Sequence, residues 1–217
     1  MPRESLKSKR ERALAVCGRI GERYPDAQPA LDFGGDPFRL TIAVLLSAQT
    51  TDAAVNKVTP VLWDRYPTVE DLAAADVRDV EDILRPIGFF RVKAANCIKC
   101  AQMVISEYGG EVPQSYEGLQ SLPGVGRKTA NIVMNAGFGI VDGIAVDTHV
   151  FRIAHKLKLS SAKDPGKTEQ DLLKLIPREL WGPVNHQWIL FGREICSAKN
   201  PKCGECFLVD ICPSAGK

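Results

Sequence analysis

Residues 122–129 read Leu-Pro-Gly-Val-Gly-Arg-Lys-Thr, a glycine-rich turn between a short predicted helix and a longer one. Gly124 and Gly126 let the backbone approach a ligand closely and adopt positive φ angles. The longer helix begins at this turn, so its unpaired N–H groups and its dipole favour a phosphate there. The stretch predicts a helix-hairpin-helix over about residues 115–137, which grips a nucleic-acid backbone without reading its sequence. A plain turn between two helices is the structural alternative.

Lys128 lies in the first turn of the longer helix, although the positive end of a helix disfavours a charged amine. The local pattern is not a phosphate-binding P-loop, because Ser121 stands where a glycine belongs and Arg127 precedes the lysine. A neutral amine at this place, favoured further by desolvation, is a nucleophile that can attack carbon and form a Schiff base. The alternative is an exposed lysine that contacts phosphate by charge alone.

Residues 146–152 read Val-Asp-Thr-His-Val-Phe-Arg and open another predicted helix. Asp147 is placed to cap that helix, which begins at Thr148. The same carboxylate, at the mouth of a helix, could also balance developing positive charge or move a proton. His149 and Arg152 are candidates for phosphate contacts, or else are structural polar residues.

Four cysteines near the carboxyl end, Cys196, Cys203, Cys206 and Cys212, have the spacing C-x6-C-x2-C-x5-C. Four thiolates from one short segment surround either a tetrahedral zinc ion or the four corners of an iron–sulfur cube. The segment has a single Cys-x2-Cys knuckle and differs from the ferredoxin spacings. The spacing therefore leaves both metals open.

The whole chain has 217 residues, 45% hydrophobic and 25% charged, which indicates one large globular domain or two small ones. A net charge of +2 is too small to identify a nucleic-acid binder, although residues 1–12 carry five lysines or arginines. No signal peptide or bilayer-spanning apolar stretch is visible, so we expect a cytoplasmic protein that does not bind membranes. Seven cysteines in such a chain favour metal ligation over disulfides, and Cys97 and Cys100 are expected to be buried in a helix.

Helical patterns dominate the chain. Asp36-Pro37 and Asp52 are candidate helix starts, and Thr68 with Asp71 resembles a capping box. Other helices are expected over about 5–23, from Asp76 to before Pro86, over 91–108, from Ser115, from Gly126 to Asn135, from Thr148 to Leu159, from Thr168 to Ile176 and from Pro183 to Cys196. Residues 139–146 are the exception, because they could form a strand pair around Asp142-Gly143. The chain is thus predicted to be nearly all-α.

The segments 122–130 and 146–149 and the four-cysteine spacing, in this order, together resemble the endonuclease III family of DNA base-excision glycosylases. Residues 45–52, Leu-Leu-Ser-Ala-Gln-Thr-Thr-Asp, also look like that family, and the similarity covers roughly residues 5–213. The resemblance implies an all-α, two-lobed helix-hairpin-helix DNA glycosylase fold.

By this resemblance, a six-helix barrel over residues 30–141 carries the hairpin, while residues 1–29 and 142–217 form a discontinuous lobe holding a [4Fe–4S] cluster. The resemblance thereby favours iron–sulfur over zinc. DNA would lie across the cleft between the lobes, with the damaged base flipped out.

The resemblance also implies a base-excision-repair enzyme, a DNA N-glycosylase that removes oxidised pyrimidines and cuts the strand as an AP lyase. Lys128 would attack C1′ of the damaged nucleotide and form an imine, after which β-elimination breaks the strand. Asp147 would stabilise positive charge on the sugar or activate the attacking group. The expected partner is double-stranded DNA containing damaged bases or abasic sites, bound by a monomer associated with the nucleoid.

Several DNA contacts carry over with the family pattern. Gln49 matches the residue that enters the gap left by the flipped base, and Phe89 matches a wedge residue that is often Leu. Lys199 and Lys202 lie in the loop, between the first two cysteines, that meets the DNA backbone in the family. The full set of expected DNA-binding residues is Gln49, Phe89, Leu122, Gly124, Gly126, His149, Lys199 and Lys202.

Three other functions compete with this one. An adenine-DNA glycosylase shares the hairpin and the cluster, but it lacks the lysine nucleophile and uses a Glu where Ala43 stands here. A non-catalytic DNA-binding module would use Lys128 as a backbone contact and Asp147 as a cap. An electron carrier would use the cluster, and the DNA-gripping hairpin argues against it.

Overall fold

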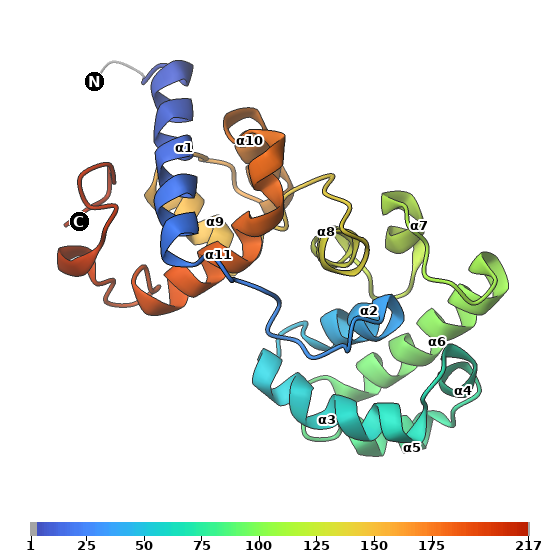
Figure 1. Cartoon of the computed structure of the whole chain (residues 1–217). Helices are drawn as coiled ribbons and strands as arrows, with labels where there is room; N and C mark the ends of the chain where they lie inside the picture. The colour runs from blue at the N-terminus through green and yellow to red at the C-terminus, as the bar shows by residue number, and fades with distance from the viewer. Residues whose placement is uncertain (1–3, 217) are drawn as a thin grey trace. The chain divides into compact units, whose positions relative to one another are not determined.

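The structure is a computed structural model that describes residues 4–216; Arg3, one of the basic residues of the amino-terminal stretch, lies outside that range. In chain order the helices are α1 (Leu6–Arg23), α2 (Pro37–Leu46), α3 (Asp52–Arg65), α4 (Val69–Ala73), α5 (Val77–Leu84), α6 (Phe90–Tyr108), α7 (Tyr116–Ser121), α8 (Arg127–Ile132), α9 (Thr148–Lys156), α10 (Pro165–Leu175) and α11 (Trp181–Glu194) (Figure 1). Shorter turns of helix are η1 (Val133–Gly137), η2 (Arg178–Leu180) and η3 (Cys203–Glu205). No strand occurs in this described part, and none of its helices is long and apolar enough to cross a membrane.

The chain divides into two compact units. Pro29–Ile140 forms one unit and contains α2 to α8 with η1. Met1–Gln28 and Val141–Lys217 together form the other, which contains α1 and α9 to α11. The second unit is therefore discontinuous in sequence, since the first is inserted between its two pieces.

The unit Pro29–Ile140 is built around α2, whose side chains from Leu40 to Leu46 are all buried. Asp36 caps this helix as predicted, because its Oδ1 accepts hydrogen bonds from the backbone N–H groups of Phe38 at 2.7 Å and Arg39 at 3.3 Å. The predicted capping box of α4 is also confirmed, with Thr68 and Asp71 bonded reciprocally. Helix α2 packs against α3, α6 and α8, so it supports the hairpin helix and the long α6 together.

The discontinuous unit has its core between α1, α9, α10 and α11. The amphipathic α1 buries Ala13, Val16 and Ile20 in a cluster that includes Trp188 and Phe191 of α11. Burial of Trp188 and Phe191 alone stabilises this unit by roughly 3–6 kcal/mol on the usual scale for large apolar side chains.

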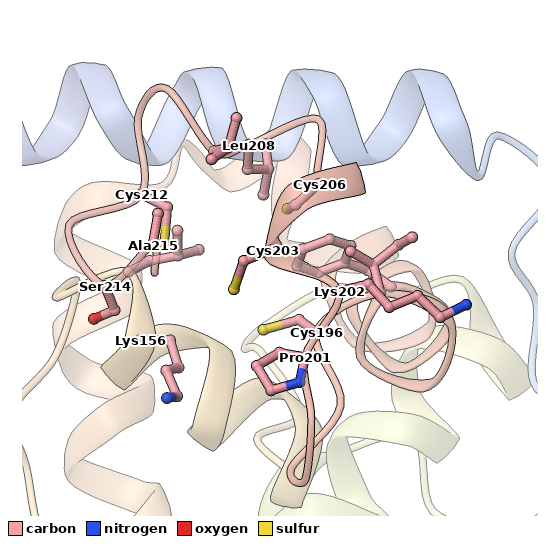
Figure 2. Close-up of a pocket in the computed structure, with 14 residues that line it drawn as sticks. Lys156, Cys196, Pro201, Lys202, Cys203, Cys206, Leu208, Cys212, Ser214 and Ala215 are labelled. Carbon is pink, nitrogen blue, oxygen red and sulfur yellow. The ribbon is translucent and has the colours of Figure 1, made fainter. Parts of the chain in front are cut away.

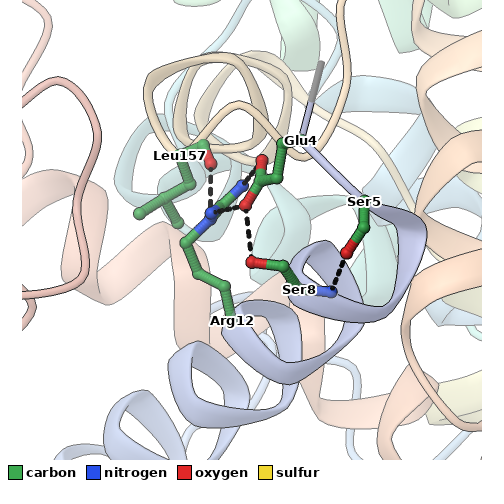
Figure 3. Close-up of polar contacts among 5 residues, drawn as sticks. All are labelled: Glu4, Ser5, Ser8, Arg12 and Leu157. Atoms are coloured by element: carbon green, nitrogen blue, oxygen red, sulfur yellow. Dashed lines mark hydrogen bonds and ion pairs between the residues drawn. The ribbon is translucent and has the colours of Figure 1, made fainter. Parts of the chain in front are cut away.

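Arg12 of α1 ties this helix to the end of α9. Its Nε donates to the carbonyl oxygen of Leu157 at 3.1 Å, and its guanidinium forms an ion pair with Glu4 (Figure 3). Ser5 caps α1 by accepting a hydrogen bond from the N–H of Ser8 at 3.1 Å, also drawn in Figure 3. Ser5 thus caps the start of α1, and Arg12 links the helix to Glu4 and to a distant carbonyl.

The predicted strand pair over residues 139–146 is wrong, because this segment is an irregular connection without strand pairing. Its carbonyl groups bond side chains rather than a partner strand: Asn185 Nδ2 donates to Ala145 O at 2.8 Å, and Arg178 Nη2 donates to Val141 O at 3.2 Å. Long-range side chains therefore satisfy a backbone that looked strand-like in sequence.

Several predicted helix ends also differ from the structure. The hydroxyl of Thr51, not Asp52, caps α3, and Asp52 is its first residue. Helix α9 ends at Lys156 instead of Leu159, since Lys158 adopts a positive φ of 52°. Helix α10 begins at Pro165, three residues before the predicted Thr168, because Asp164 caps it.

Candidate functional site

Side chains of α2 and α6 lie close to the glycine-rich turn between α7 and α8. Gly124 has a φ of +80°, and a Cβ there would lie 2.9 Å from Leu45 Cδ1 and 3.2 Å from Asn96 Nδ2, so only glycine fits without strain. Gly126 has a φ of −92°, so the predicted positive φ is wrong at this position. Gly126 is the N-cap of α8 and no side chain caps that helix, which leaves its amino end open toward a ligand.

Leu122 and Val125 anchor the turn to the core. Leu122 is 2% exposed, and its carbonyl oxygen accepts the Val125 N–H at 3.0 Å. Both polar backbone groups of Leu122 are engaged, because its own N–H donates to Leu119 O at 3.2 Å. Leu122 was predicted to bind DNA, but its side chain is turned inward and supports the hairpin from beneath.

Lys128 is the second residue of α8. The side chain is exposed and makes no hydrogen bond or ion pair with the described residues. The desolvation expected from the sequence is therefore absent, whereas the helix end that disfavours a charged amine is present as predicted. The structure brings together an open helix terminus and an unengaged amine.

Asp147 caps α9 with a single oxygen. Its Oδ1 accepts hydrogen bonds from the backbone N–H groups of His149 and Val150, each at 2.8 Å. Oδ2 accepts no hydrogen bond from the described residues, so one carboxylate oxygen is fixed by the backbone and the other is not. The predicted capping role of Asp147 is confirmed.

Arg152 is engaged within the protein and is not available for a phosphate. Its Nε and Nη2 donate to Cys196 O at 3.1 and 2.9 Å, and Nη2 also donates to Gly192 O at 3.1 Å. Nη2 lies 3.2 Å from His149 Nδ1. Because a guanidinium only donates, Nδ1 accepts and the ring proton of a neutral His149 sits on Nε2.

Gln49 and Phe89 border the same pocket, which Leu45, Ala48, Val92, Lys93, Asn96 and Gly124 also line. Both adopt left-handed backbone conformations, with φ of 53° and 57°, and both side chains are exposed, Phe89 to 65%. Such conformations cost about 1–3 kcal/mol each in residues other than glycine, and they concentrate at functional sites. Nothing in the local sequence indicates this shared geometry.

The four predicted metal ligands line one cavity beside α11 and η3. Figure 2 shows the sulfur atoms of Cys196, Cys203, Cys206 and Cys212 around it, with Leu208 and Pro201 among the other walls. Among residues 4–216 no three His, Cys, Asp or Glu side chains gather closely enough to hold a single metal ion. Four thiols around one cavity are placed as a cluster with one ligand at each corner requires.

Burial raises the pKa of the Cys196 and Cys206 thiols, and on Cys196 the Arg152 guanidinium acts in the opposite direction. A bound metal supplies the positive charge that turns such thiols into thiolates. Arg19 of α1 braces the same segment, because its Nη1 donates to Phe207 O at 2.9 Å and its guanidinium forms an ion pair with Asp210. These residues therefore fit a metal cluster held in a braced loop.

Lys199 and Lys202 lie on the exposed loop before Cys203, as predicted. The hydroxyl of Ser197 closes this loop by donating to Lys199 O at 2.6 Å and Asn200 O at 3.2 Å. In Figure 2 the Lys202 amine points away from the sulfur atoms. The loop thus presents positive charge to solvent rather than to the cavity.

Two findings concern residues outside the predicted set. Cys97 and Cys100 are fully buried on α6, as expected, and burial raises the pKa of Cys100 to about 12, so these thiols are unreactive. Lys93, which the sequence reasoning missed, is 4% exposed and borders the pocket of Gln49 and Phe89. Its position four residues after Phe89, among apolar neighbours, is the signal that could have found it.

Comparison with known proteins places these features in a family. Residues 42–178 match the HhH-GPD superfamily of base excision DNA repair proteins, and residues 196–212 match the iron–sulfur binding domain of endonuclease III. The chain is 45% identical over 210 residues to endonuclease III of Synechocystis sp., covering 97% of this chain and 95% of that one.

Two solved structures are similar over 95% of this chain and 96% of their own, each at 42% identity. One is a non-covalent endonuclease III–DNA complex, with a TM-score of 0.89. The other is a trapped endonuclease III–DNA covalent intermediate, an estranged-adenine complex, with a TM-score of 0.90.

These matches confirm the predicted all-α helix-hairpin-helix DNA glycosylase fold. They also decide between the metals that the cysteine spacing left open, in favour of a [4Fe–4S] cluster. The chain belongs to the endonuclease III family, and it has a hairpin turn, an Asp147 that caps α9, and four thiols around one cavity.

Proposed function

We propose that this protein is a base-excision-repair DNA N-glycosylase that removes oxidised pyrimidines from duplex DNA and cuts the strand as an AP lyase. The observation that carries the proposal is the unengaged amine of Lys128 at the uncapped amino end of α8. A lysine in that position is poorly suited to structural support, and an amine that is not engaged by the protein can act as a nucleophile.

In the proposed reaction the neutral Nζ of Lys128 attacks C1′ of the damaged nucleotide. A bond forms between Nζ and C1′, and the glycosidic bond breaks, so the base leaves with the bonding electron pair and takes up a proton. Loss of the amine proton and opening of the sugar give an imine. Removal of a proton from C2′ then expels the 3′ phosphate, and water releases the lysine by hydrolysis.

Asp147 is proposed to assist at the sugar. Its Oδ1 is occupied by two backbone N–H groups, which fix the carboxylate, while Oδ2 stays available for a developing positive charge or a proton. His149 lies on the first turn of the same helix and is proposed to contact a phosphate oxygen there.

The hairpin is proposed to hold the DNA backbone. Gly124 and Gly126 remove side chains from the turn, so a phosphate can meet the open N–H groups of α8 directly. Lys199 and Lys202 add charge that binds backbone without reading sequence. Leu122 contributes by supporting the turn, since its side chain is buried.

Gln49 and Phe89 are proposed to enter the duplex where the damaged base leaves the stack. Their exposure and their common pocket agree with this role, and the aromatic ring of Phe89 offsets lost stacking. Cys196, Cys203, Cys206 and Cys212 would hold the [4Fe–4S] cluster, which supplies structural support for the loop carrying Lys199 and Lys202. The protein would act on DNA in the nucleoid, and its monomeric state stays a prediction.

The adenine-DNA glycosylase alternative lacks support in the structure. Ala43, which stands where that enzyme uses a Glu, is buried inside α2 and offers no carboxylate. A non-catalytic binding module would use Lys128 as a backbone contact and Asp147 as a cap, and it would leave Oδ2 of Asp147 without a role.

The product of the reaction tests the proposed function. A duplex with one thymine glycol is incubated with the protein, and the labelled strand is resolved with and without later alkali treatment. We expect a β-elimination product before alkali, and no product from the undamaged duplex. Cleavage only after alkali would replace the lyase by a monofunctional glycosylase, and no base release from any oxidised pyrimidine would contradict the proposal.

A further inference from the structure

Lys93, near the amino end of α6, carries a buried charge that no step above uses. Its side chain is 4% exposed, and its Nζ donates a hydrogen bond to Thr50 Oγ1 at 2.5 Å. Burial lowers the pKa of Lys93, since desolvation disfavours the charged form. The ammonium is thus held at a definite place at a cost in solvation.

This lysine touches both turns that border the pocket of Gln49 and Phe89. Its backbone N–H donates to Phe89 O at 3.0 Å, while its side chain reaches Thr50, the neighbour of Gln49. Gln49 and Phe89 are also the two non-glycine residues of the unit Pro29–Ile140 that have a positive φ. One residue therefore contacts both strained turns, with its backbone at Phe89 and its side chain at Thr50.

Thr50 passes the contact on to the rest of its turn. Its hydroxyl accepts from Lys93 and donates to Ala48 O at 3.4 Å, and its backbone N–H donates to Ser47 O at 3.1 Å. The hydroxyl lies one residue from Gln49, so movement of the ammonium would be transmitted directly to the left-handed residue. Thr50 is the acceptor through which Lys93 acts on the turn.

The hydrogen bond between Lys93 and Thr50 is poorly explained by a contribution to the stability of the fold. A buried ammonium loses its hydration, and a neutral hydroxyl returns only part of that loss. An apolar side chain of the same length would fill the space without this penalty. What a hydrogen bond from a charged donor adds is a fixed geometry.

We propose that Lys93 is a positioning residue that holds the Gln49 turn and Phe89 at a fixed spacing, so that both side chains enter the duplex together. The inference rests on the proposed function, because it assigns the pocket to the site of base extrusion.

The test compares binding to two duplexes, one undamaged and one with a tetrahydrofuran abasic analogue opposite 2-aminopurine, whose fluorescence rises when it is unstacked. Lys93→Met and Thr50→Val remove the two partners of the hydrogen bond, singly and together. Thr50→Ser keeps the hydroxyl, and Lys99→Met makes the same change as Lys93→Met at an exposed position of α6. Thermal unfolding of every variant is measured in parallel.

We expect Lys93→Met and Thr50→Val each to reduce the preference for the abasic duplex by about tenfold and to lower the fluorescence signal. The double variant should lose no more than either single variant, since one interaction is removed in all three. Thr50→Ser and Lys99→Met should resemble the unaltered protein, and Lys93→Met should unfold at the same or a higher temperature.

Full preference and full fluorescence in Lys93→Met or Thr50→Val would overturn the positioning role, and so would losses that multiply in the double variant. If Lys93→Met does not fold, Thr50→Val alone tests the positioning role. An unaltered protein that does not prefer the abasic duplex would overturn the proposed function, and this inference with it.

Discussion

Asp147 caps α9 with one carboxylate oxygen and is proposed to assist the reaction with the other, and substitution can separate the two roles. Oδ1 accepts two backbone N–H groups at the start of α9, and Oδ2 accepts none from the described residues. Asn in this position keeps the accepting oxygen and removes the charge, whereas Ala removes both. The cap and the chemistry therefore respond differently to the two changes.

We predict that Asp147→Asn lowers the rate of base release by roughly 100-fold or more, the usual contribution of a charged catalytic group. Its free energy of unfolding should stay close to that of the unaltered protein. Asp147→Ala should lose the same activity and about 1 kcal/mol of stability in addition. Single-turnover base release and urea unfolding measure the two effects, and an Asp147→Asn variant with full activity would make the residue a cap alone.

At the scale of the element, helix α1 braces the segment that carries the cluster ligands. Arg19 reaches Phe207 O and Asp210 on the loop between Cys206 and Cys212, whereas Arg23, one turn later, pairs with Glu194 of α11 at 2.8 Å. The two arginines are alike in chemistry and differ in what they hold. Arg19 bonds the loop between Cys206 and Cys212, whereas Arg23 bonds helix α11.

Replacing Arg19 by Met should loosen the loop and speed the loss of the cluster severalfold when an iron chelator is added. The decay of the visible absorbance of the cluster gives the rate. Arg23→Met is the matched control and should leave the rate unchanged, because the helix pair that it breaks lies outside the loop. Equal rates for Arg19→Met and the unaltered protein would show that the loop is stable without its brace.

The ion pair between Glu4 and Arg12 at the start of α1 makes the stability of the protein depend on pH. The Arg12 guanidinium holds the pKa of Glu4 below its ordinary value, mainly through their hydrogen bond. A lowered folded-state pKa means that the stabilisation is complete above the ordinary glutamate pKa and is lost as the pH falls through the lower value.

Glu4→Gln should therefore lower the free energy of unfolding at pH 7 by less than about 1 kcal/mol, since the pair is partly exposed, and lower the melting temperature slightly. The difference from the unaltered protein should vanish toward pH 3. Glu11→Gln, at an exposed position of the same helix, should show no such trend. A difference that persists in acid would mean that the carboxylate charge is not the cause.

The helices follow largely from local signals, which explains how far the sequence could predict them. Asp36, Thr68 and Asp76 cap the helices expected of them, because an N-cap needs only residues two or three positions away. The supposed strand pair failed for the opposite reason, since its carbonyl groups bond Asn185 and Arg178 from a distant segment.

Some features of the candidate site could also be predicted from local sequence, and others could not. The spacing of four thiols within one segment was enough to predict that they share a cavity. The shared pocket of Gln49 and Phe89 has no local signature, and the hydrogen bond of Lys93 to Thr50 spans 43 residues of sequence, although the spacing of Lys93 from Phe89 hints at its burial. The inward turn of Leu122 was hidden likewise, because packing decides it.

At the scale of the whole molecule, the proposed reaction draws on residues from both units. Lys128 belongs to Pro29–Ile140, whereas Asp147 and the four cysteines belong to the unit that includes Val141–Lys217. The chain leaves the discontinuous unit at Gln28 and returns to it at Val141. The identity of 42–45% to endonuclease III proteins extends over 95–97% of this chain, and so over both units.

Lys128 is proposed to become covalently joined to DNA, and borohydride reduction traps that bond as a stable adduct. The protein is mixed with a duplex carrying one thymine glycol, the imine is reduced, and the modified peptide is identified by mass spectrometry. Lys93→Met and Lys128→Ala are treated in parallel. We predict an adduct on Lys128 in the unaltered protein and in Lys93→Met, and none in Lys128→Ala. An adduct of equal yield in Lys128→Ala, or one mapped to another amine, would show that Lys128 is not the nucleophile.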